Sequence, residues 1–291
     1  MLDALLQQIA NGLMMGSIYA LVALGMVLIY GVMEVLNFAH GVLFMLGGYL
    51  CHLFFTSILG SYAASLLASM VALGAIGYTL ETLVFRYLRD NLRNQVVASL
   101  GLVLVIQNLV IALWGPQALQ LRLAYAEVLV ALGPLHFSVQ QLVIVAVTLS
   151  VIAALHIFLS YSKLGTAVRA TSQNREAARV VGIDVDRVYW LSFALGTALA
   201  ALGGGLIGPL FLVSPTMGDL PLLKGLAAIV LGGMGNVWGA VAGALLIGVA
   251  EAVSTLAVPT DYRDAIPFAA IVLILLLRPQ GLFGFQLRAE A

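Results

Sequence analysis

Charged residues are scarce in this chain, and their scarcity excludes an ordinary soluble domain. Only 9% of the 291 residues are Asp, Glu, Lys or Arg, whereas a soluble domain contains about 25%. Hydrophobic residues make up 62%, and the mean hydropathy is +1.08. Several apolar runs exceed the roughly 18–20 residues that cross a bilayer as a helix. The sequence therefore predicts an all-α polytopic membrane protein.

Two further shortages narrow the class of protein. The formal net charge is zero, so bulk charge predicts no nucleic-acid partner. The single cysteine, Cys51, can form no intramolecular disulfide and lacks the partners of a metal or thiol site. We interpret it as a small packing residue, in the protein core or facing lipid. We expect neither a metal nor any other cofactor to be bound by this chain.

Several catalytic and nucleotide-binding motifs are also missing. The chain contains no G-x-x-x-x-G-K-[ST] phosphate loop, no H-E-x-x-H and no G-x-S-x-G. It has no cytoplasmic segment long enough for a nucleotide-binding domain, so we predict that it is not an enzyme and cannot hydrolyse ATP alone. The N-terminal MLDALLQQIANG carries no basic residue and no A-x-A-like site, which predicts a retained first helix rather than a cleaved signal peptide.

What the chain has in abundance is apolar sequence, which we interpret as one transmembrane domain over residues 1–291. The apolar segments lie at about 5–31, 38–59, 61–85, 96–114, 138–160, 188–213, 225–257 and 265–278. They predict about 8–10 transmembrane or re-entrant helices, with two discontinuous segments among them.

The basic residues gather in three of the connecting regions. These residues are Arg86, Arg89 and Arg93, then Lys163, Arg169, Arg175, Arg179 and Arg187, and finally Arg278 and Arg288. By the positive-inside rule all three regions face the cytoplasm. Arg122, Lys224 and Arg263 are scattered singly through regions that would then face outward. The N-terminus is also predicted to lie outside if each of the first three segments crosses fully.

The run at 225–257 is too long for a single crossing. Three segments lie between the cytoplasmic Arg187 and Arg278, which is an odd number unless the middle run enters and returns as a hairpin. LGGMGN, residues 231–236, supplies glycines that tolerate positive φ and close backbone approach. We therefore predict a helix break there, between a short arm at about 225–233 and a longer arm at about 238–257.

A second interruption lies near the N-terminus, in EVLNFAHG at residues 34–41. Paired breaks in the two halves of a transporter indicate a pathway built from discontinuous helices, because unwound backbone is tolerated only against protein or water. The residues assigned to the pathway or to the breaks are Asn37, His40, Gly41, Gly232, Gly233, Gly235 and Asn236. Alternatively, the glycines permit tight helix crossings, and Asn37 and His40 cap helix ends or bond across an interface.

Isolated charges inside apolar runs require a reason, since each costs about 2.5–3.5 kcal/mol or more at mid-bilayer. Glu34 and His40 are expected to stay wet at the first break. Glu81 is expected to reach the interface, and Lys224 could extend its amine to the outer edge of the hairpin. Glu251 lies deeper inside its apolar run, so a purely structural role explains it less easily. His52, His136 and His156 are interpreted as packing or interface residues.

Small residues recur every four positions on two predicted helices, which favours a tightly packed bundle. The first stripe is Gly12, Gly16 and Ala20, and the second is Ser192, Gly196, Ala200, Gly204 and Gly208. In lipid, such stripes let helix backbones approach closely.

The long cytoplasmic loop, at about 161–187, carries the most specific pattern. Ser172 could cap a short helix that runs to about Val181, and Gly182 could end it. Asp184 or Asp186 could then cap the next transmembrane helix. The apolar face of the short helix carries alanines rather than Trp, Phe or Leu, so it suits a protein groove better than a lipid interface.

The run REAARVVGI, residues 175–183, resembles the EAA-x-x-x-G coupling motif of bacterial ABC-importer permeases. Further motifs are NGLMMGSIYALVALGMVLIYGV at 11–32, NFAHG at 37–41, and LKGLAAIVLGGMGNVWGAVAGALLIGVAE at 223–251. Together they resemble the branched-chain amino-acid permease family, the leucine/isoleucine/valine type, on its H-subunit side. Family members often carry an acidic residue after the histidine and glycine, where this chain has Val42. Related permeases for urea and short amides have similar motifs, so the solute stays open.

The resemblance implies an importer subunit in a bacterial cytoplasmic membrane. A second permease subunit, of M type, would complete the pathway, two cytoplasmic ATPases would bind ATP and Mg, and a periplasmic or lipid-anchored protein would deliver the solute. ATP-driven alternating access would act through a short cytoplasmic helix. By the resemblance, the coupling residues are Arg175, Glu176, Ala177, Ala178, Arg179 and Gly182.

Two rival classes use the same features. An ion-coupled secondary transporter or channel could use the paired breaks, with Glu34, Glu251 or His40 as an ion or proton site. A membrane enzyme or haem protein could use the histidines, although His40 and His52 share one apolar segment and His156 is near a cytoplasmic end. Of the three classes, the importer permease is the interpretation that explains the cytoplasmic loop in addition to the paired breaks.

Overall fold

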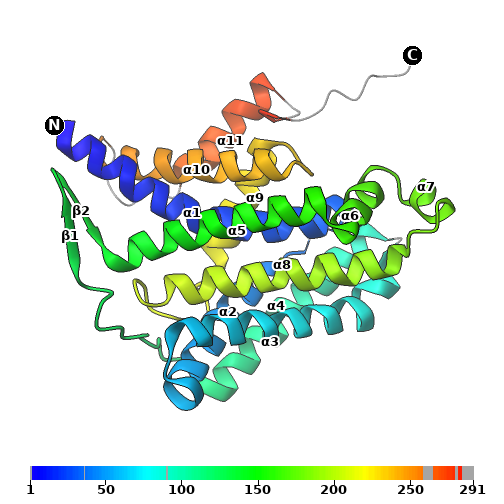
Figure 1. Ribbon diagram of the computed structural model, residues 1–291, viewed down its shortest axis with the longest axis horizontal. Coiled ribbons are helices and arrows are strands. Elements are labelled where there is room, and N and C mark those ends of the chain that lie inside the picture. The colour runs from blue at the N-terminus through cyan, green and yellow to red at the C-terminus, as the bar shows by residue number, and fades with distance from the viewer. Residues whose placement is uncertain (1, 36, 90, 258–264, 279–280, 284–291) are drawn as a thin grey trace.

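The computed structural model describes residues 2–283, apart from residues 36, 90, 258–264 and 279–280. Most of the long helices lie side by side with roughly parallel axes (Figure 1). The helices are α1 (Leu2–Met33), α2 (His40–Leu53), α3 (Tyr62–Leu83), α4 (Leu92–Trp114), α5 (Val139–Tyr161), α6 (Lys163–Gln173), α7 (Arg175–Val180), α8 (Val185–Ile207), α9 (Asp219–Gly232), α10 (Val237–Ser254) and α11 (Ala265–Leu277). A π-helical turn, Phe54–Leu59, extends α2, and a 3-10 turn, Phe85–Leu88, precedes α4.

The predicted helical membrane fold is confirmed. Within the described residues, 7 helical stretches are long and apolar enough to cross a membrane: α1, α2 with its π-helical turn, α3, α4, α5, α8 and α10. One element was not expected, an antiparallel hairpin of β1 (Leu129–Leu132) and β2 (Leu135–Ser138). It lies beside the N-terminal end of α1, where the Gln7 side chain accepts from the backbone N–H of His136 at 2.9 Å.

Helix α1 forms the centre of the bundle, and its small residues explain why. In its membrane-length apolar stretch 89% of the residues are buried, compared with 17% in that of α4, and only the N-terminal part of α1 is exposed. A Cβ added to Gly12 would lie 2.6 Å from Cα of Val249, and one on Gly16 would lie 2.9 Å from Cα of Leu245. The expected role of the first small-residue stripe is therefore confirmed, because it admits the backbone of α10 to van der Waals contact.

The second stripe, on α8, does the same for two other helices. A Cβ on Gly196 would lie 2.6 Å from the carbonyl oxygen of Gly25 in α1. Gly204 faces the backbone of Phe44, and Gly47 faces that of Ala201, so α2 packs on α8 with its backbone in close contact. Residues 208–213 were expected to continue this helix, but α8 ends at Ile207.

The basic loop lies at the end of the bundle opposite the N-terminus. Figure 1 shows the N-terminus and the β-hairpin at one end, and α6 and α7 at the other. The C-terminal end of α1 lies near residues 171–176, which line a polar cavity together with Gly31, Val32 and Glu34. We call this the α7 end of the molecule. The arrangement agrees with the prediction that the N-terminus and the basic loop face opposite sides of the membrane.

The chain is interrupted twice between its long helices. After α1 it leaves the helical path at Glu34 and turns back, so that α2 begins at His40, whose imidazole packs against Gly25 in the middle of α1. After α8 the chain runs through residues 208–218 without a helix, with Val213 beside Gly48, and α9 then begins at Asp219. Both α2 and α9 therefore start inside the bundle.

Candidate translocation site

The two interruptions meet at a pair of glycines. A Cβ on Gly41 would lie 2.6 Å from the carbonyl oxygen of Gly218, and Gly218 faces Gly41 in the same way. From this contact α9 runs toward the α7 end, since Gly225 packs on Val22 and Gly235 lies beside Gly31. Helix α2 runs the other way, along α8. Two helices of 14 residues, α9 and the part of α2 before its π-helical turn, thus diverge in opposite directions from a single point, and we call them the half-helices.

The helix break predicted at LGGMGN is present as the turn at residues 233–236 between α9 and α10, at the α7 end. It is not the interruption that meets NFAHG. The hairpin itself is present, with arms Asp219–Gly232 and Val237–Ser254 in place of 225–233 and 238–257. The counterpart of NFAHG is the segment at 208–218, whose apolar start resembles the end of a helix. Its two prolines, its two glycines and its serine were the available signal.

Each residue of the GGMGN turn has an identifiable structural part. Gly233 and Gly235 adopt φ of 99° and 85°, which L side chains rarely adopt. Gly232 packs against the backbone of Gly239, so the two arms touch. Asn236 caps α10 by accepting from the N–H of Gly239 at 3.0 Å. The turn is also covered by a later segment, because Leu282 N–H donates to the Leu231 carbonyl at 2.8 Å.

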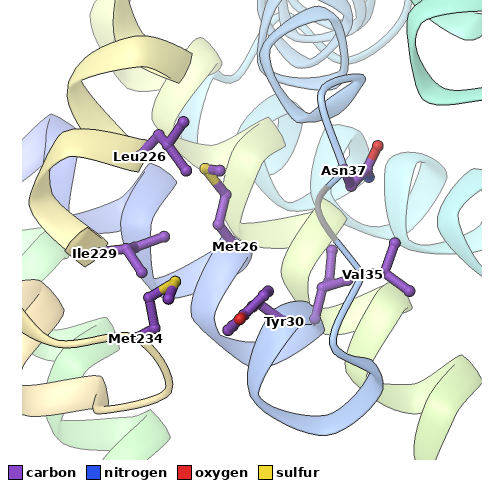
Figure 2. Close-up of a pocket in the computed structure, with 8 residues that line it drawn as sticks. Met26, Tyr30, Val35, Asn37, Leu226, Ile229 and Met234 are labelled. Carbon is purple, nitrogen blue, oxygen red and sulfur yellow. The ribbon is translucent and has the colours of Figure 1, made fainter. Parts of the chain in front are cut away.

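A narrow apolar cavity lies between α1, the first interruption and α9 (Figure 2). Its walls are Met26, Ile29 and Tyr30 from α1, Val35 and Asn37 from the interruption, Leu226 and Ile229 from α9, and Met234 from the turn. None of these residues is charged. The cavity has room for about one water molecule, so a larger solute enters only when its walls separate.

Asn37 is the polar group at the upper end of this cavity, next to the start of α2. Its Oδ1 accepts from the N–H of Ala39 at 3.0 Å, which fixes the turn into α2. Its Nδ2 is buried without a hydrogen-bond partner among the described residues. The capping alternative therefore accounts for Oδ1 of Asn37 but not for Nδ2.

His40 and Glu34 differ from each other in exposure, although both were expected to stay wet. Glu34 is exposed and has φ 56°, a strained value for a residue other than glycine. His40 is fully buried, because α2 begins in the middle of the bundle. A Cβ on Gly25 would lie 2.8 Å from the His40 ring, so the imidazole packs against α1 where Gly25 has no side chain. The expectation of a wet His40 is therefore wrong.

Lys224 and Glu251 form a buried pair that the sequence analysis did not foresee. Lys224 Nζ donates to Glu251 Oε1 at 2.9 Å, and their side chains are 4% and 2% exposed. The Tyr19 hydroxyl donates to the other carboxylate oxygen of Glu251 at 3.0 Å. Lys224 therefore does not extend to an outer edge. The pair joins α9 to α10, and Tyr19 joins both to α1.

A second charged cluster lies at the α7 end. The Arg89 guanidinium bonds to Glu81 of α3 and to Asp186 of α8, and lies 4.4 Å above the ring of Tyr189. Burial opposes the charge of Arg89, but the bonds to Glu81 and Asp186 outweigh it and raise its pKa. Glu81 is only 2% exposed, and its bond to Arg89 places it beside the basic loop. Arg89 had been counted only as one charge of a basic loop. Its partner Asp186 is 97 residues away, and Glu81, 8 residues away, belongs to the preceding helix.

The short helix α7 lies within the predicted loop, with one correction. Asn174, not Ser172, caps it by accepting from the N–H groups of Glu176 and Ala177. Gly182, at φ 85°, ends it as predicted, with Ile183 N–H donating to Ala178 O and Gly182 N–H donating to Arg179 O, both at 3.0 Å. Asp184 then caps α8, as one of the two predicted candidates.

The faces of α7 are clearly divided. Ala178 is 3% exposed and packs on the bundle, whereas Val180 and Val181 are 87% and 75% exposed. Arg175, Glu176, Ala177 and Arg179 are also exposed. The helix thus presents an apolar strip of Ala177, Val180 and Val181 between charged side chains. Val180 is the member of this strip that the sequence analysis did not name.

Other expected positions are quickly placed. Cys51 is buried in the core, and the His156 ring lies 5.2 Å from that of Trp238. Arg263 and Arg288 lie outside the described residues. Across the described part of the chain, no three His, Cys, Asp or Glu side chains are grouped as a metal site.

A bundle of membrane-length helices around two half-helices, with an exposed short helix at one end, is the architecture of a multi-pass membrane protein. The family model described as "Branched-chain amino acid transport system / permease component" matches residues 8–275. The chain belongs to this permease family. It is therefore a transport subunit of the bacterial cytoplasmic membrane and not an enzyme.

Individual relatives agree with the family model. The high-affinity branched-chain amino acid transport system permease protein LivH of Escherichia coli (strain K12) is 34% identical over 96% of this chain and 95% of its own length. BraD of Pseudomonas aeruginosa, with the same description, is also 34% identical over the same shares. A probable branched-chain amino acid transport permease of Methanocaldococcus jannaschii is 27% identical over 76% of this chain. The comparison with solved structures found no match.

Proposed function

We propose that this chain is a permease subunit of an ATP-driven importer of branched-chain amino acids. The observation that carries the proposal is the similarity to permeases of that description over 96% of the chain. The cavity supports it, because an uncharged wall of Met, Ile, Leu and Val side chains suits an aliphatic solute. Urea and short amides, which the sequence left open, would find few polar partners on such a wall.

In this proposal α7 is the contact with a cytoplasmic ATPase. Its exposed strip of Ala177, Val180 and Val181 fits an apolar groove, and Arg175, Glu176 and Arg179 give the contact a charged rim. The tight end at Gly182 and the cap at Asp184 connect α7 to α8 with only a few residues between. A displacement of α7 is therefore passed to α8 instead of being absorbed by a loose linker.

Helix α8 can carry that displacement to the site. It contacts α1 through Gly196 and α2 through Gly204, and Arg89 ties its first turn to α3. Two further subunit types follow from the proposal: ATPases that bind ATP and Mg, and a second permease that completes the pathway. A periplasmic or lipid-anchored protein would deliver the solute. Driven by ATP, the cavity would open first to one side of the membrane and then to the other, and never to both at once.

Co-purification and reconstitution test this function together. The tagged chain is isolated with its partners, which are identified by mass spectrometry, and the complex is placed in proteoliposomes. Uptake of radiolabelled leucine that requires both ATP and the solute-binding protein is the expected result. Uptake by the chain alone, driven by an ion gradient, would show a secondary transporter instead. Uptake of urea or a short amide with none of leucine would overturn the substrate.

A further inference from the structure

The first turn of α2 carries backbone donors at the point where the half-helices meet. The N–H of His40 donates to Asn37 O at 3.2 Å, and that of Leu43 donates to Ala39 O at 3.0 Å. No acceptor among the described residues faces the N–H groups of Gly41 and Val42, which lie between them. Such first-turn donors, with the positive end of the helix dipole, favour a negatively charged partner.

Asn37 adds a second, independent indication of a ligand. Its side chain lines the cavity, the residue is 5% exposed, and its Nδ2 has no partner within the described chain. A buried amide donor without an acceptor costs free energy unless something fills the position. Because Oδ1 is already bound to Ala39 N–H, the amide cannot turn over without breaking that bond. Nδ2 is therefore held as a donor beside the start of α2.

Apart from Tyr30, which carries a hydroxyl, the rest of the cavity offers apolar contact. Its wall includes Met26 and Ile29 of α1 and Leu226 and Ile229 of α9. Figure 2 shows Leu226 and Ile229 on the side of the cavity away from Asn37. Met26 and Met234 are unbranched and flexible, so they can adapt to aliphatic side chains of different shape. An unpaired amide donor at Asn37, next to the start of α2, and a largely apolar wall match an amino acid with an aliphatic side chain.

We propose that this is a transient binding site for the amino acid in transit, with its carboxylate held at the start of α2. Asn37 Nδ2 and the N–H groups of Gly41 and Val42 bind the carboxylate, and the apolar wall receives the aliphatic side chain. The inference rests on the proposed function and adds the orientation of the solute. With no charged residue on the wall, the site holds its ligand weakly, as a pathway must if it is to release the solute on both sides.

Asn37→Asp is the sharpest variant. Aspartate keeps the oxygen that accepts from Ala39 N–H, so the turn into α2 persists, but it replaces the donor with a second oxygen facing the carboxylate. Leucine uptake by the reconstituted complex should fall by more than tenfold, since a hydrogen bond to a charged group contributes about tenfold or more. The matched control is Asn94→Asp, at an exposed position in the first turn of α4, which should leave uptake unchanged.

A labelling experiment covers the case in which Asn37→Asp impairs assembly. Cys51 is the sole cysteine of the chain, so Cys51→Ala gives a background without thiols. Ile229→Cys, on the cavity wall, is then labelled with a small thiol reagent in the assembled complex during ATP turnover. Leucine supplied with the binding protein should slow its labelling several-fold. Leu109→Cys, exposed on α4, should react at the same rate with and without leucine.

The outcomes separate this site from the function it rests on. If the wild-type complex imports leucine, Asn37→Asp imports it equally well and leucine leaves Ile229→Cys unprotected, the site is wrong and the function stands. If the wild-type complex imports no branched-chain amino acid, the function itself fails. Reduced uptake by Asn37→Asp together with protection of Ile229→Cys supports the site.

Discussion

At the scale of single residues, the most consequential feature is Lys224, a lysine that is buried in an apolar bundle. A lone ammonium group there would be costly, but Lys224 lies 2.9 Å from Glu251, which also accepts from Tyr19. The three side chains come from α9, α10 and α1, so the charges hold together three helices that the small-residue stripes merely allow to touch. Removing one charge is therefore different from removing both.

Lys224→Met should destabilise the protein strongly, because it leaves Glu251 buried without its cation. Breaking a buried pair in this way costs about 3–5 kcal/mol. The double variant Lys224→Met/Glu251→Leu should recover most of the loss, since apolar replacements of similar size restore packing. Denaturation of the purified protein in detergent measures both. Equal losses in the single and the double variant would contradict this role for the pair.

Asn37 and His40 show how far single residues can be interpreted from sequence. Both were singled out because polar groups are rare in this chain, and both do lie where the bundle is interrupted. The sequence did not show how deeply each residue is buried in the bundle. His40 is buried because the chain doubles back along α1, and that path depends on Gly25 and Gly196 being small enough to accept it. The partners of Lys224 and Arg89 could not be identified from the sequence for the same reason. Those of Lys224 lie 27 or more residues away. For both residues the partners belong to other helices.

At the scale of elements, the contact between the starts of α2 and α9 depends on having no side chain at Gly41 and Gly218. Gly41→Ala would place a Cβ 2.6 Å from the Gly218 carbonyl oxygen, which forces the half-helices apart. We predict that this variant loses most leucine uptake. Gly101→Ala is the matched control, because a Cβ there meets no atom within 4 Å. That change should be neutral, or stabilising by about 0.5–1 kcal/mol. Uptake and thermal stability of both variants are the measurements.

Helix α7, proposed above as the contact with the ATPase, offers a test of a different kind. Glu176→Lys reverses an exposed charge in its first turn, where a cation is also disfavoured by the helix dipole by about 0.3–1 kcal/mol. The protein should insert and assemble, but uptake should be lost while ATP hydrolysis by the complex persists. Glu127→Lys makes the same exposed substitution near the β-hairpin, at the opposite end of the bundle, and should leave uptake intact. Normal uptake by Glu176→Lys would remove α7 from the coupling role.

Elements with local signals were predicted well from the sequence, and those defined by tertiary contact were not. Gly182 and Asp184 were assigned correctly because a left-handed helix end and an N-cap are determined within a few residues. Asn174 displaced Ser172 as the cap because a separate helix, α6, occupies residues 163–173. The interruption at 208–218 was missed since its apolar residues satisfy a hydropathy pattern whether or not they are helical. Only the contact with Gly41 shows why α9 begins where it does.

At the scale of the whole molecule, the prediction is one of sidedness. With Cys51→Ala as background, Glu127→Cys near the β-hairpin should react with a membrane-impermeant thiol reagent added to spheroplasts. Ser172→Cys at the α7 end should react only after the membrane is permeabilised. Both positions are exposed, so access and not burial decides the result. Labelling of both from the same side would contradict the assignment of the two ends to opposite faces.

The glycine contact between α2 and α9 has a consequence for any tilting of these two helices. The two helices start there and extend in opposite directions, one toward the hairpin end and the other toward the α7 end. If they tilt as a rigid pair, like a see-saw, widening at one end is accompanied by narrowing at the other. A leak through the whole thickness of the membrane would need both ends wide at once. The geometry of one close backbone contact thereby opposes it without a separate gate.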